Sequence, residues 1–303
     1  MNLPKQVVIC EVGPRDGLQK EYKVLTVNEK VELINDLSDA GYKVIEVGSF
    51  VSHKAVPQMA STDEVFSKIK KKQGVEYRAF VANQKGVERA ITCGCNKIKL
   101  NVSACKKHNL ANLNMTIDDS ILIFKNCVDL ASSNGLQISG SISMPFGSPW
   151  EHSIPIDDVK DIINAYLNVG VKEISLSDTS GMAVPTQVYN MCTEFKRIFP
   201  EVKWILHFHN TRGVGNANIL AGMLAGVNWF DTSFGGLGGC PFVPGAEGNV
   251  VSEDVIHMLH EMGIDTGIDL DKTINIAKKM SEILGHSLYG YILKANKSSN
   301  LIR

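Results

Sequence analysis

The chain has 303 residues, of which 44% are hydrophobic and 21% are charged, and its formal net charge is −1. This length and composition are typical of one large or two ordinary globular domains with a sizeable core. The near-zero charge excludes a broad basic field for nucleic acid or an anionic membrane, and no apolar run reaches the ~18 residues that a membrane span needs.

The seven cysteines are scattered and include no Cys-x-x-Cys pair. We therefore expect reduced thiols rather than a disulfide framework. The first residues, MNLPKQVVICEV, lack the charged segment, apolar run and cleavage site of a secretory signal. A cytoplasmic location is predicted.

Short apolar runs rich in β-branched and aromatic residues recur along the chain, and each is short enough to be a strand. The predicted strands are Val7–Val12, Val44–Gly48, Tyr77–Ala82, Ile98–Val102, Ile138–Met144, Glu173–Leu176, Trp204–Phe208 and Trp229–Thr232.

Stretches with helical periodicity lie between these runs. In the first, Val31, Leu33, Ile34 and Leu37 form an apolar stripe, and Gly41 follows as a typical helix end. The predicted helices are Asn28–Ala40, Asp118–Ser133, Ile156–Val169, Pro185–Phe199 and Asn216–Ala225.

Eight strands alternating with helices predict an α/β fold, a (β/α)8 TIM barrel over about residues 5–250. Additional C-terminal helices are expected over about 252–303, within a single domain spanning 1–303. A doubly wound open sheet is the alternative, but no Gly-rich dinucleotide fingerprint follows the first strand. In a barrel, the chemistry lies in the loops that follow the strands.

The loop after the first strand places Arg15 and Asp16 side by side between two glycines. A plain type I or II turn with an exposed ion pair is one interpretation of this loop. A catalytic role at the mouth of the barrel is the other.

His207 and His209 lie two residues apart at the end of the seventh strand, so both imidazoles should face the barrel interior while Phe208 packs outward. Two such histidines favour a metal site. Asp16 and Asn249 could complete a mixed oxygen and nitrogen shell that suits Mg²⁺ or Mn²⁺, with Zn²⁺ as the alternative.

A glycine-rich segment, GGLGGCPFVPGAEGNV, covers 235–250 and lacks the Gly-Lys-Ser/Thr ending of a phosphate-binding loop. With it, the sequence resembles 3-hydroxy-3-methylglutaryl-CoA lyase over most of the chain, from Val7 to about Asp269. The motifs that carry the resemblance are Glu11–Gln19, Val44–Glu46, Ser49–Val51, Val56–Met59, Ile174–Leu176, Asp178–Thr179, His207–His209 and Gly236–Pro241.

The resemblance implies cleavage of 3-hydroxy-3-methylglutaryl-CoA to acetyl-CoA and acetoacetate, in leucine breakdown or ketone-body formation. It implies a divalent cation at Asp16, His207, His209 and Asn249. Arg15 would stabilise the product enolate, Cys240 would transfer a proton from a loop that closes over the substrate, and Glu46 would support the site. The residues expected to bind the acyl-CoA substrate are Arg15, Gln19, Ser49, Asp178 and Thr179.

Either Asp16 or His207 could accept the proton of the 3-hydroxyl group. His108, just after the fourth strand, is a candidate for the mouth of the barrel. The resemblance also implies a homodimer or higher homo-oligomer.

The sequence departs from the family pattern at four places, which concern the acyl or CoA pocket rather than the proposed metal ligands. A serine, Ser177, replaces the usual glycine, and Asn210 replaces an aspartate after the second histidine. The other two are Phe146–Glu151 and the region from Lys106 to Ala111. A longer or differently branched 3-hydroxyacyl-CoA is the variation they suggest.

Two other functions compete with this hypothesis. One is another enzyme of the same barrel superfamily, a condensing acyltransferase or a 2-keto-acid aldolase. The other is a barrel that binds CoA or metal without catalysis, against which the complete set of polar residues argues.

Overall fold

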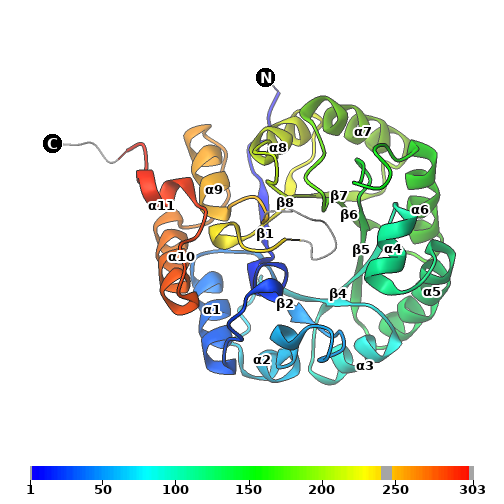
Figure 1. The fold of residues 1–303 in the computed structure, drawn as a ribbon, viewed down its shortest axis with the longest axis horizontal. Helices are drawn as coiled ribbons and strands as arrows, with labels where there is room; N and C mark the ends of the chain where they lie inside the picture. Colours follow the sequence, from blue (N-terminus) through cyan, green and yellow to red (C-terminus); the bar gives the residue numbers. More distant parts are fainter. Residues whose placement is uncertain (1, 240–247, 300–303) are drawn as a thin grey trace.

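The computed structural model describes residues 2–239 and 248–299. Eight parallel strands close into a barrel in chain order, and β1 pairs with both β2 and β8 (Figure 1). This confirms the predicted (β/α)8 barrel. The strands are β1 Val8–Glu11, β2 Val44–Ser49, β3 Glu76–Val81, β4 Lys97–Ser103, β5 Gln137–Ser143, β6 Glu173–Asp178, β7 Lys203–Phe208 and β8 Trp229–Thr232.

Helices surround the barrel (Figure 1). They are α1 Val27–Asp39, α2 Thr62–Lys68, α3 Gln84–Thr92, α4 Lys106–Leu113, α5 Ile117–Ser133, α6 Ile156–Asn168, α7 Pro185–Ile198, α8 Gly215–Leu224, α9 Ser252–Glu261, α10 Leu270–Leu284 and α11 Tyr291–Ala295. The predicted helices match α1, α5, α6, α7 and α8 within about one residue. Helices α2, α3 and α4 were not predicted because they are short, and short segments carry little periodic signal.

Local sequence defines both ends of α1. At its start, Thr26 and Glu29 form a capping box, in which each side chain accepts a hydrogen bond from the other residue's backbone N–H. At its end, Gly41 has a φ of +104°, and a Cβ there would lie 2.3 Å from the carbonyl oxygen of Gly267. Only glycine fits this close approach.

The C-terminal helices lie beside the β1–β8 side of the barrel (Figure 1). Helix α9 follows β8, and α10 contacts both α9 and α1. Asp254 of α9 accepts backbone hydrogen bonds from Tyr291 and Ile292 and so anchors the start of α11. The predicted helical segment after residue 252 is thus present, whereas the single-domain assignment over 1–303 stays a prediction.

The apolar core lies between the strands and the helices. Leu33, Ile34 and Leu37 of α1 are buried there, as the predicted stripe requires, and Phe195 of α7 stacks on Trp204 with ring centres 5.7 Å apart. The interior of the barrel is different, because buried charged and hydroxyl side chains fill much of it. This polar interior determines what the barrel can bind.

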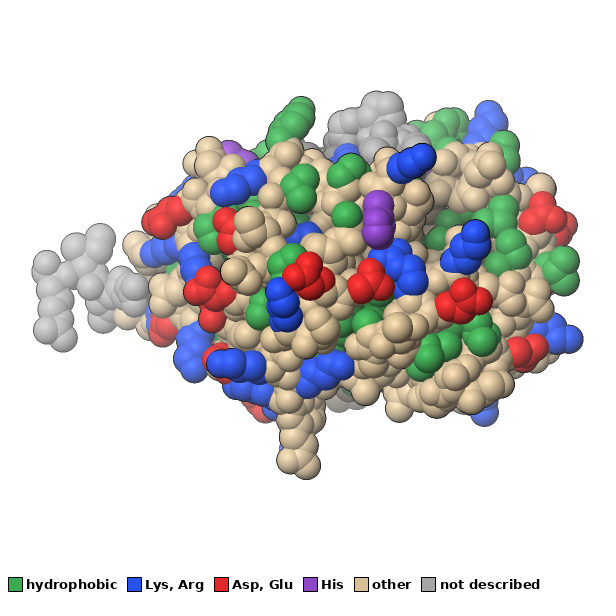
Figure 2. All heavy atoms as spheres, turned by 90° about the horizontal axis from the view of Figure 1, so that it is seen from below, with side chains coloured by type: hydrophobic (Ala, Val, Ile, Leu, Met, Phe, Trp, Pro, Cys, Tyr) green, Lys and Arg blue, Asp and Glu red, His purple; other side chains and the backbone are tan. Residues whose placement is uncertain are grey.

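No helix in the described part of the chain is long and apolar enough to cross a membrane. On the face drawn in Figure 2, basic and acidic side chains are interspersed, in keeping with the small net charge.

Candidate active site

The turn after β1 carries Arg15 and Asp16. Residues Gly13–Gly17 form one π-helical turn, in which the carbonyl of Val12 accepts backbone N–H bonds from Arg15, Asp16 and Gly17. Asp16 is buried and the Arg15 side chain is 12% exposed, so the alternative of a plain turn with an exposed ion pair is wrong. Single π-turns of this kind are frequent at functional sites.

Asp16 faces two imidazoles at the end of β7. His207 and His209 alternate with Phe208, which packs against Phe146 with ring centres 6.1 Å apart. The two imidazole centres lie 5.2 Å apart, and ligand atoms of Asp16, His207 and His209 all lie within 4.8 Å of one another. The expected convergence of these three side chains is therefore present in the structure.

Asn249 reaches the same point from the segment after β8. Its Nδ2 donates to Asp16 Oδ2 at 2.8 Å and to the Leu237 carbonyl at 3.0 Å. Its Oδ1 is buried and accepts no hydrogen bond from any residue that the structure describes. Leaving a buried acceptor unsatisfied costs free energy, and a cation would remove that cost. The donor set therefore fits a divalent cation held by two imidazoles and two oxygens.

Arg15 connects this donor set to a second carboxylate. Its Nε donates to Glu46 of β2, its Nη1 contacts Asp16 Oδ1, and its guanidinium lies 5.1 Å from the centre of the Phe80 ring. Gln19 also donates to Asp16 Oδ1, at 3.0 Å. Burial alone would raise the pKa of Asp16, but Arg15 and the two imidazoles hold it well below its usual range. Asp16 is thus ionised at neutral pH.

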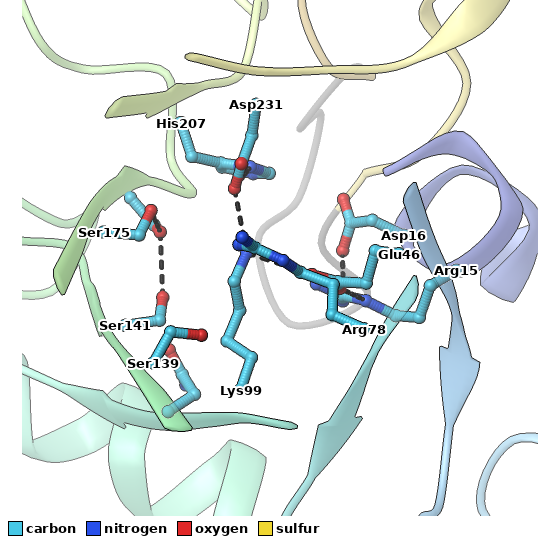
Figure 3. Close-up of polar contacts among 12 residues, drawn as sticks. Arg15, Asp16, Glu46, Arg78, Lys99, Ser139, Ser141, Ser175, His207 and Asp231 are labelled. Carbon is cyan, nitrogen blue, oxygen red and sulfur yellow. Dashed lines mark hydrogen bonds and ion pairs between the residues drawn. The ribbon is translucent and has the colours of Figure 1, made fainter. Parts of the chain in front are cut away.

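Two further charged residues of this region were missed from the sequence. Lys99 of β4 lies 3.0 Å from Glu46 Oε2 and 2.9 Å from Asp231 Oδ2, and that Asp231 oxygen lies 3.4 Å from His207 Nδ1 (Figure 3). A signal was present, because Lys97, Lys99 and Asn101 alternate with apolar residues and must share one face of β4.

A cavity of about 510 Å³ opens beside these groups at the carboxyl ends of the strands. The residues with predicted roles that line it are Arg15, Asp16, Gln19, Ser49, Thr179, His207 and His209. His108 also lines it, which confirms its expected place at the mouth.

The remaining predicted residues lie elsewhere. Glu46 is buried behind Arg15. Asp178 turns into its own loop, where its carboxylate accepts hydrogen bonds from the N–H groups of Met182 and Ala183. Burial raises the pKa of Asp178 to about 6, against the lowering effect of these bonds. The structure does not bring Asp178 into the cavity lining, and Cys240 lies outside the described residues.

The wall of the cavity formed by β4, β5 and β6 is polar. The hydroxyl oxygens of Ser177 and Ser141 lie 3.0 Å apart, and the hydroxyl group of Ser143 donates to Asn101 Oδ1 at 2.8 Å. We call Asn101, Ser141, Ser143 and Ser177 the serine wall; all four line the cavity. One departure from the family pattern, Ser177, therefore lines the cavity.

Among the other departures, His108 of the region from Lys106 to Ala111 lines the cavity. Ser148 donates to Cys105 Sγ at 3.3 Å, and the rings of Trp150 and His108 lie 6.3 Å apart. Asn210 has a local role, since its Oδ1 accepts the backbone N–H of Gly215 at the start of α8.

The fold and site define a class of protein. It is a (β/α)8 barrel with a carboxylate, two imidazoles and an amide close together at the carboxyl ends of its strands, next to a buried guanidinium. The chain belongs to the HMGL-like family, whose model matches residues 6–280. It is 39% identical to hydroxymethylglutaryl-CoA lyase YngG of Bacillus subtilis, over 99% of this chain and 100% of that protein.

Two more comparisons show the same likeness. The chain is 39% identical to a 3-hydroxy-3-isohexenylglutaryl-CoA/hydroxy-methylglutaryl-CoA lyase of Pseudomonas aeruginosa, over 95% of this chain and 96% of that protein. An HMG-CoA lyase structure from Acinetobacter baumannii in complex with coenzyme A and 3-methylmalate has a TM-score of 0.95 and 40% identity, over 99% of this chain and 98% of that one.

Proposed function

We propose that this protein is a divalent-metal-dependent carbon–carbon lyase that cleaves 3-hydroxy-3-methylglutaryl-CoA, or a close 3-hydroxyacyl-CoA, to acetyl-CoA and acetoacetate. The observation that carries the proposal is the unsatisfied Oδ1 of Asn249 beside Asp16, His207 and His209. Family membership and relatives named as lyases of this kind support it.

The cation would be held by Asp16, His207, His209 and Asn249, and we propose Mg²⁺ or Mn²⁺ because oxygen and imidazole ligands with room for water suit these ions. When bound, such an ion polarises an oxygen and lowers the pKa of a hydroxyl group.

The reaction breaks the C2–C3 bond of the thioester. The 3-hydroxyl group loses its proton and becomes the ketone of acetoacetate, the C2–C3 electron pair moves to C2 as a thioester enolate, and C2 then gains a proton to give acetyl-CoA. Asp16 and His207 both line the cavity, which supports each of them as a candidate to accept the hydroxyl proton. The pKa of Asp16 is lowered, which weakens Asp16 as a base.

Arg15 is proposed to stabilise the enolate. Its guanidinium is held by Glu46 and Asp16 and lines the cavity, so it needs little rearrangement when negative charge develops on the thioester oxygen. We assign the proton that reaches C2 to Cys240, on the resemblance alone. Ser49, Thr179 and Gln19 line the cavity and are proposed substrate contacts.

The acyl group is the open part of this proposal. The serine wall supports a substrate whose branch at C3 is short or polar, because buried hydroxyl groups facing a long apolar chain would lose hydrogen bonds to water. The expected pathway is leucine breakdown or ketone-body formation. The homodimer or higher oligomer and the cytoplasmic location remain proposals as well.

The test is a substrate panel with purified protein. Thioesters that differ only at C3, with a methyl or an isohexenyl branch, are incubated with Mg²⁺, with Mn²⁺ and with a chelator, and acetyl-CoA and the keto acid are measured. We expect metal-dependent acetoacetate from the methyl substrate at a higher kcat/KM than for the isohexenyl one.

Absence of acetoacetate above the chelated control would contradict the lyase proposal. Release of free CoA from acetyl-CoA and a 2-keto acid would instead favour the condensing acyltransferase. Release of pyruvate from a keto-acid adduct would favour the aldolase.

A further inference from the structure

Lys99 lies in the middle of β4 and points into the barrel, beneath the candidate active site (Figure 3). Its side chain is only 3% exposed, and its Nζ contacts two buried carboxylates, Glu46 at 3.0 Å and Asp231 at 2.9 Å. An ammonium group with two carboxylate partners at these distances is well satisfied. It is therefore suited to hold other groups in place rather than to exchange a proton.

Each of these carboxylates holds one reactive side chain. Glu46 accepts from Nε of Arg15, and Asp231 Oδ2 lies 3.4 Å from Nδ1 of His207. The contacts therefore form one continuous chain, Arg15–Glu46–Lys99–Asp231–His207. It crosses the barrel interior through β2, β4, β8 and β7, and Lys99 is its midpoint.

The charges along this series of contacts explain why a cation is needed at its midpoint, Lys99. Glu46 and Asp231 are fully buried, and each carboxylate repels the other. With Lys99 absent, two buried carboxylates would face one another, and at least one would turn away or take up a proton. Either change would release Arg15 or His207 from its present orientation.

We propose that Lys99 is a positioning residue, which fixes Glu46 and Asp231 so that Arg15 and His207 face the same part of the cavity. This inference rests on the proposed lyase function. Residues that hold a metal ligand or a catalytic group through a hydrogen bond typically change metal affinity or activity by about 10- to 100-fold when removed.

Lys97 provides a matched control on the same strand. It lies two residues earlier, on the same inward face, and its Nζ also contacts two carboxylates, Glu76 at 3.2 Å and Glu173 at 2.6 Å. Neither of those carboxylates contacts a proposed ligand or lines the cavity. Lys97→Met therefore removes the same kind of buried ion pair without touching the chain of contacts to Arg15 and His207.

The experiment compares Lys99→Met with Lys97→Met in the full-length protein. We expect Lys99→Met to lower kcat by about 10- to 100-fold with a change in KM of less than about threefold. Lys97→Met should lower the unfolding midpoint but leave kcat within about twofold of wild type. Equal effects of both variants on kcat, or wild-type kcat in Lys99→Met, would overturn the proposal.

A variant without these charges is included in case Lys99→Met fails to fold. Lys99→Met combined with Glu46→Gln and Asp231→Asn removes the lysine and both of its carboxylate partners together, so neither carboxylate is left buried without a cation and the variant should fold. Its kcat should stay at least about tenfold below wild type, because neutral amides hold a guanidinium and an imidazole less firmly. Recovery of wild-type kcat would assign Lys99 to charge balance alone and overturn the positioning role.

A readout without substrate separates this inference from the lyase proposal. Mn²⁺ affinity is measured by electron paramagnetic resonance for wild type, Lys99→Met and Lys97→Met. Lys99→Met should bind Mn²⁺ about tenfold more weakly, and Lys97→Met should bind as wild type does. If no thioester is cleaved by the wild type, the lyase proposal fails, while this comparison still decides the role of Lys99.

Discussion

The two ends of the barrel interior both bury charge, but they do so differently. At the amino ends of the strands, Glu173 contacts Arg78, Lys97 and Lys203 at distances of 3.1, 2.6 and 3.0 Å. At the carboxyl ends, Asp16 shares its site with two imidazoles and with an amide oxygen that has no partner among the described residues.

The contrast between the two ends shows how a ligand site can be recognised among buried charges. The amino end also has an unsatisfied atom, Nη1 of Arg78, which finds no partner in the described part of the chain. That atom is a donor on a cation and cannot hold a metal ion, whereas Asn249 Oδ1 is an acceptor among other acceptors. A cation-binding site therefore has an unsatisfied acceptor and an adjoining cavity. An ion-pair network that only supports the fold has neither of these together.

The largest effect is expected at the carboxyl end, from Arg15→Met. The variant keeps much of the side-chain volume but loses the guanidinium that would stabilise the enolate, so kcat should fall by about 10²–10³-fold, or about 3–4 kcal/mol. Steady-state kinetics with saturating metal measure this. Arg15→Lys is the matched control and should also lose most activity, because an ammonium cannot present the same planar pair of donors. Activity near that of wild type in Arg15→Met would rule out the assigned role.

At the amino end, Lys97→Met should affect stability instead. It leaves Glu173 and Glu76 without one cation, and we expect a loss of about 3 kcal/mol in the free energy of unfolding, at the low end for a buried pair because Glu76 is partly exposed. Chemical denaturation measures the loss. A large fall in kcat without a loss of stability would show that the two ends are not separate in function.

Gly238 provides a smaller test of the ligand site itself. Its φ is +114°, and a Cβ there would lie 2.5 Å from Nδ2 of Asn249, so Gly238→Ala should displace the Asn249 side chain. We expect about 1–3 kcal/mol weaker Mn²⁺ binding, measured by titration. Gly74→Ala is the control, because its φ of +79° is also positive but no atom lies within 4 Å of the added Cβ. Equal Mn²⁺ affinity in the two variants would argue against Asn249 as a ligand.

The smallest effect concerns pH and two buried acids, Glu11 and Glu253, which accept hydrogen bonds from the N–H groups of Phe234 and Gly235. Burial raises the pKa of Glu253 to about 8 and that of Glu11 to about 7. Acids with a raised pKa in the folded state contribute stability at low pH and lose that contribution as pH rises, here between about 4.5 and 8. Glu253→Gln should therefore flatten the decline in unfolding free energy over this range, by at most about 1.4 kcal/mol per pH unit.

The control for this prediction is Glu261→Gln, which changes an exposed glutamate of the same helix, α9. It should leave the slope unchanged. Identical slopes for Glu253→Gln and wild type would mean that Glu253 titrates normally in the folded protein.

Much of the fold could be predicted because each strand is a short β-branched or aromatic run between polar loops. The histidine pair could also be predicted, since strand alternation alone places His207 and His209 on one face. The place of Asn249 beside Asp16 followed from a closed barrel together with the resemblance. No local pattern connects residues 233 positions apart in the sequence.

The polar interior could not be predicted in the same way. Lys99 is recognisable as inward-facing, but its partner Asp231 lies 132 residues further along and meets it only across the closed barrel. Asp178 was expected to bind substrate, and that role stays a prediction. Alternation from Ser177, which lines the cavity, places Asp178 on the other face of β6, where it supports its own loop.

The most direct test of the account is a Mn²⁺ titration of wild type and of His209→Ala, followed by electron paramagnetic resonance with detection of nitrogen couplings. We predict one tightly bound Mn²⁺ per chain in the wild type, with coupling to imidazole nitrogen, and at least about tenfold weaker binding with reduced nitrogen coupling in the variant. A wild-type protein that binds no Mn²⁺, or a variant with unchanged affinity and couplings, would contradict the claim that Asp16, His207, His209 and Asn249 hold one catalytic cation.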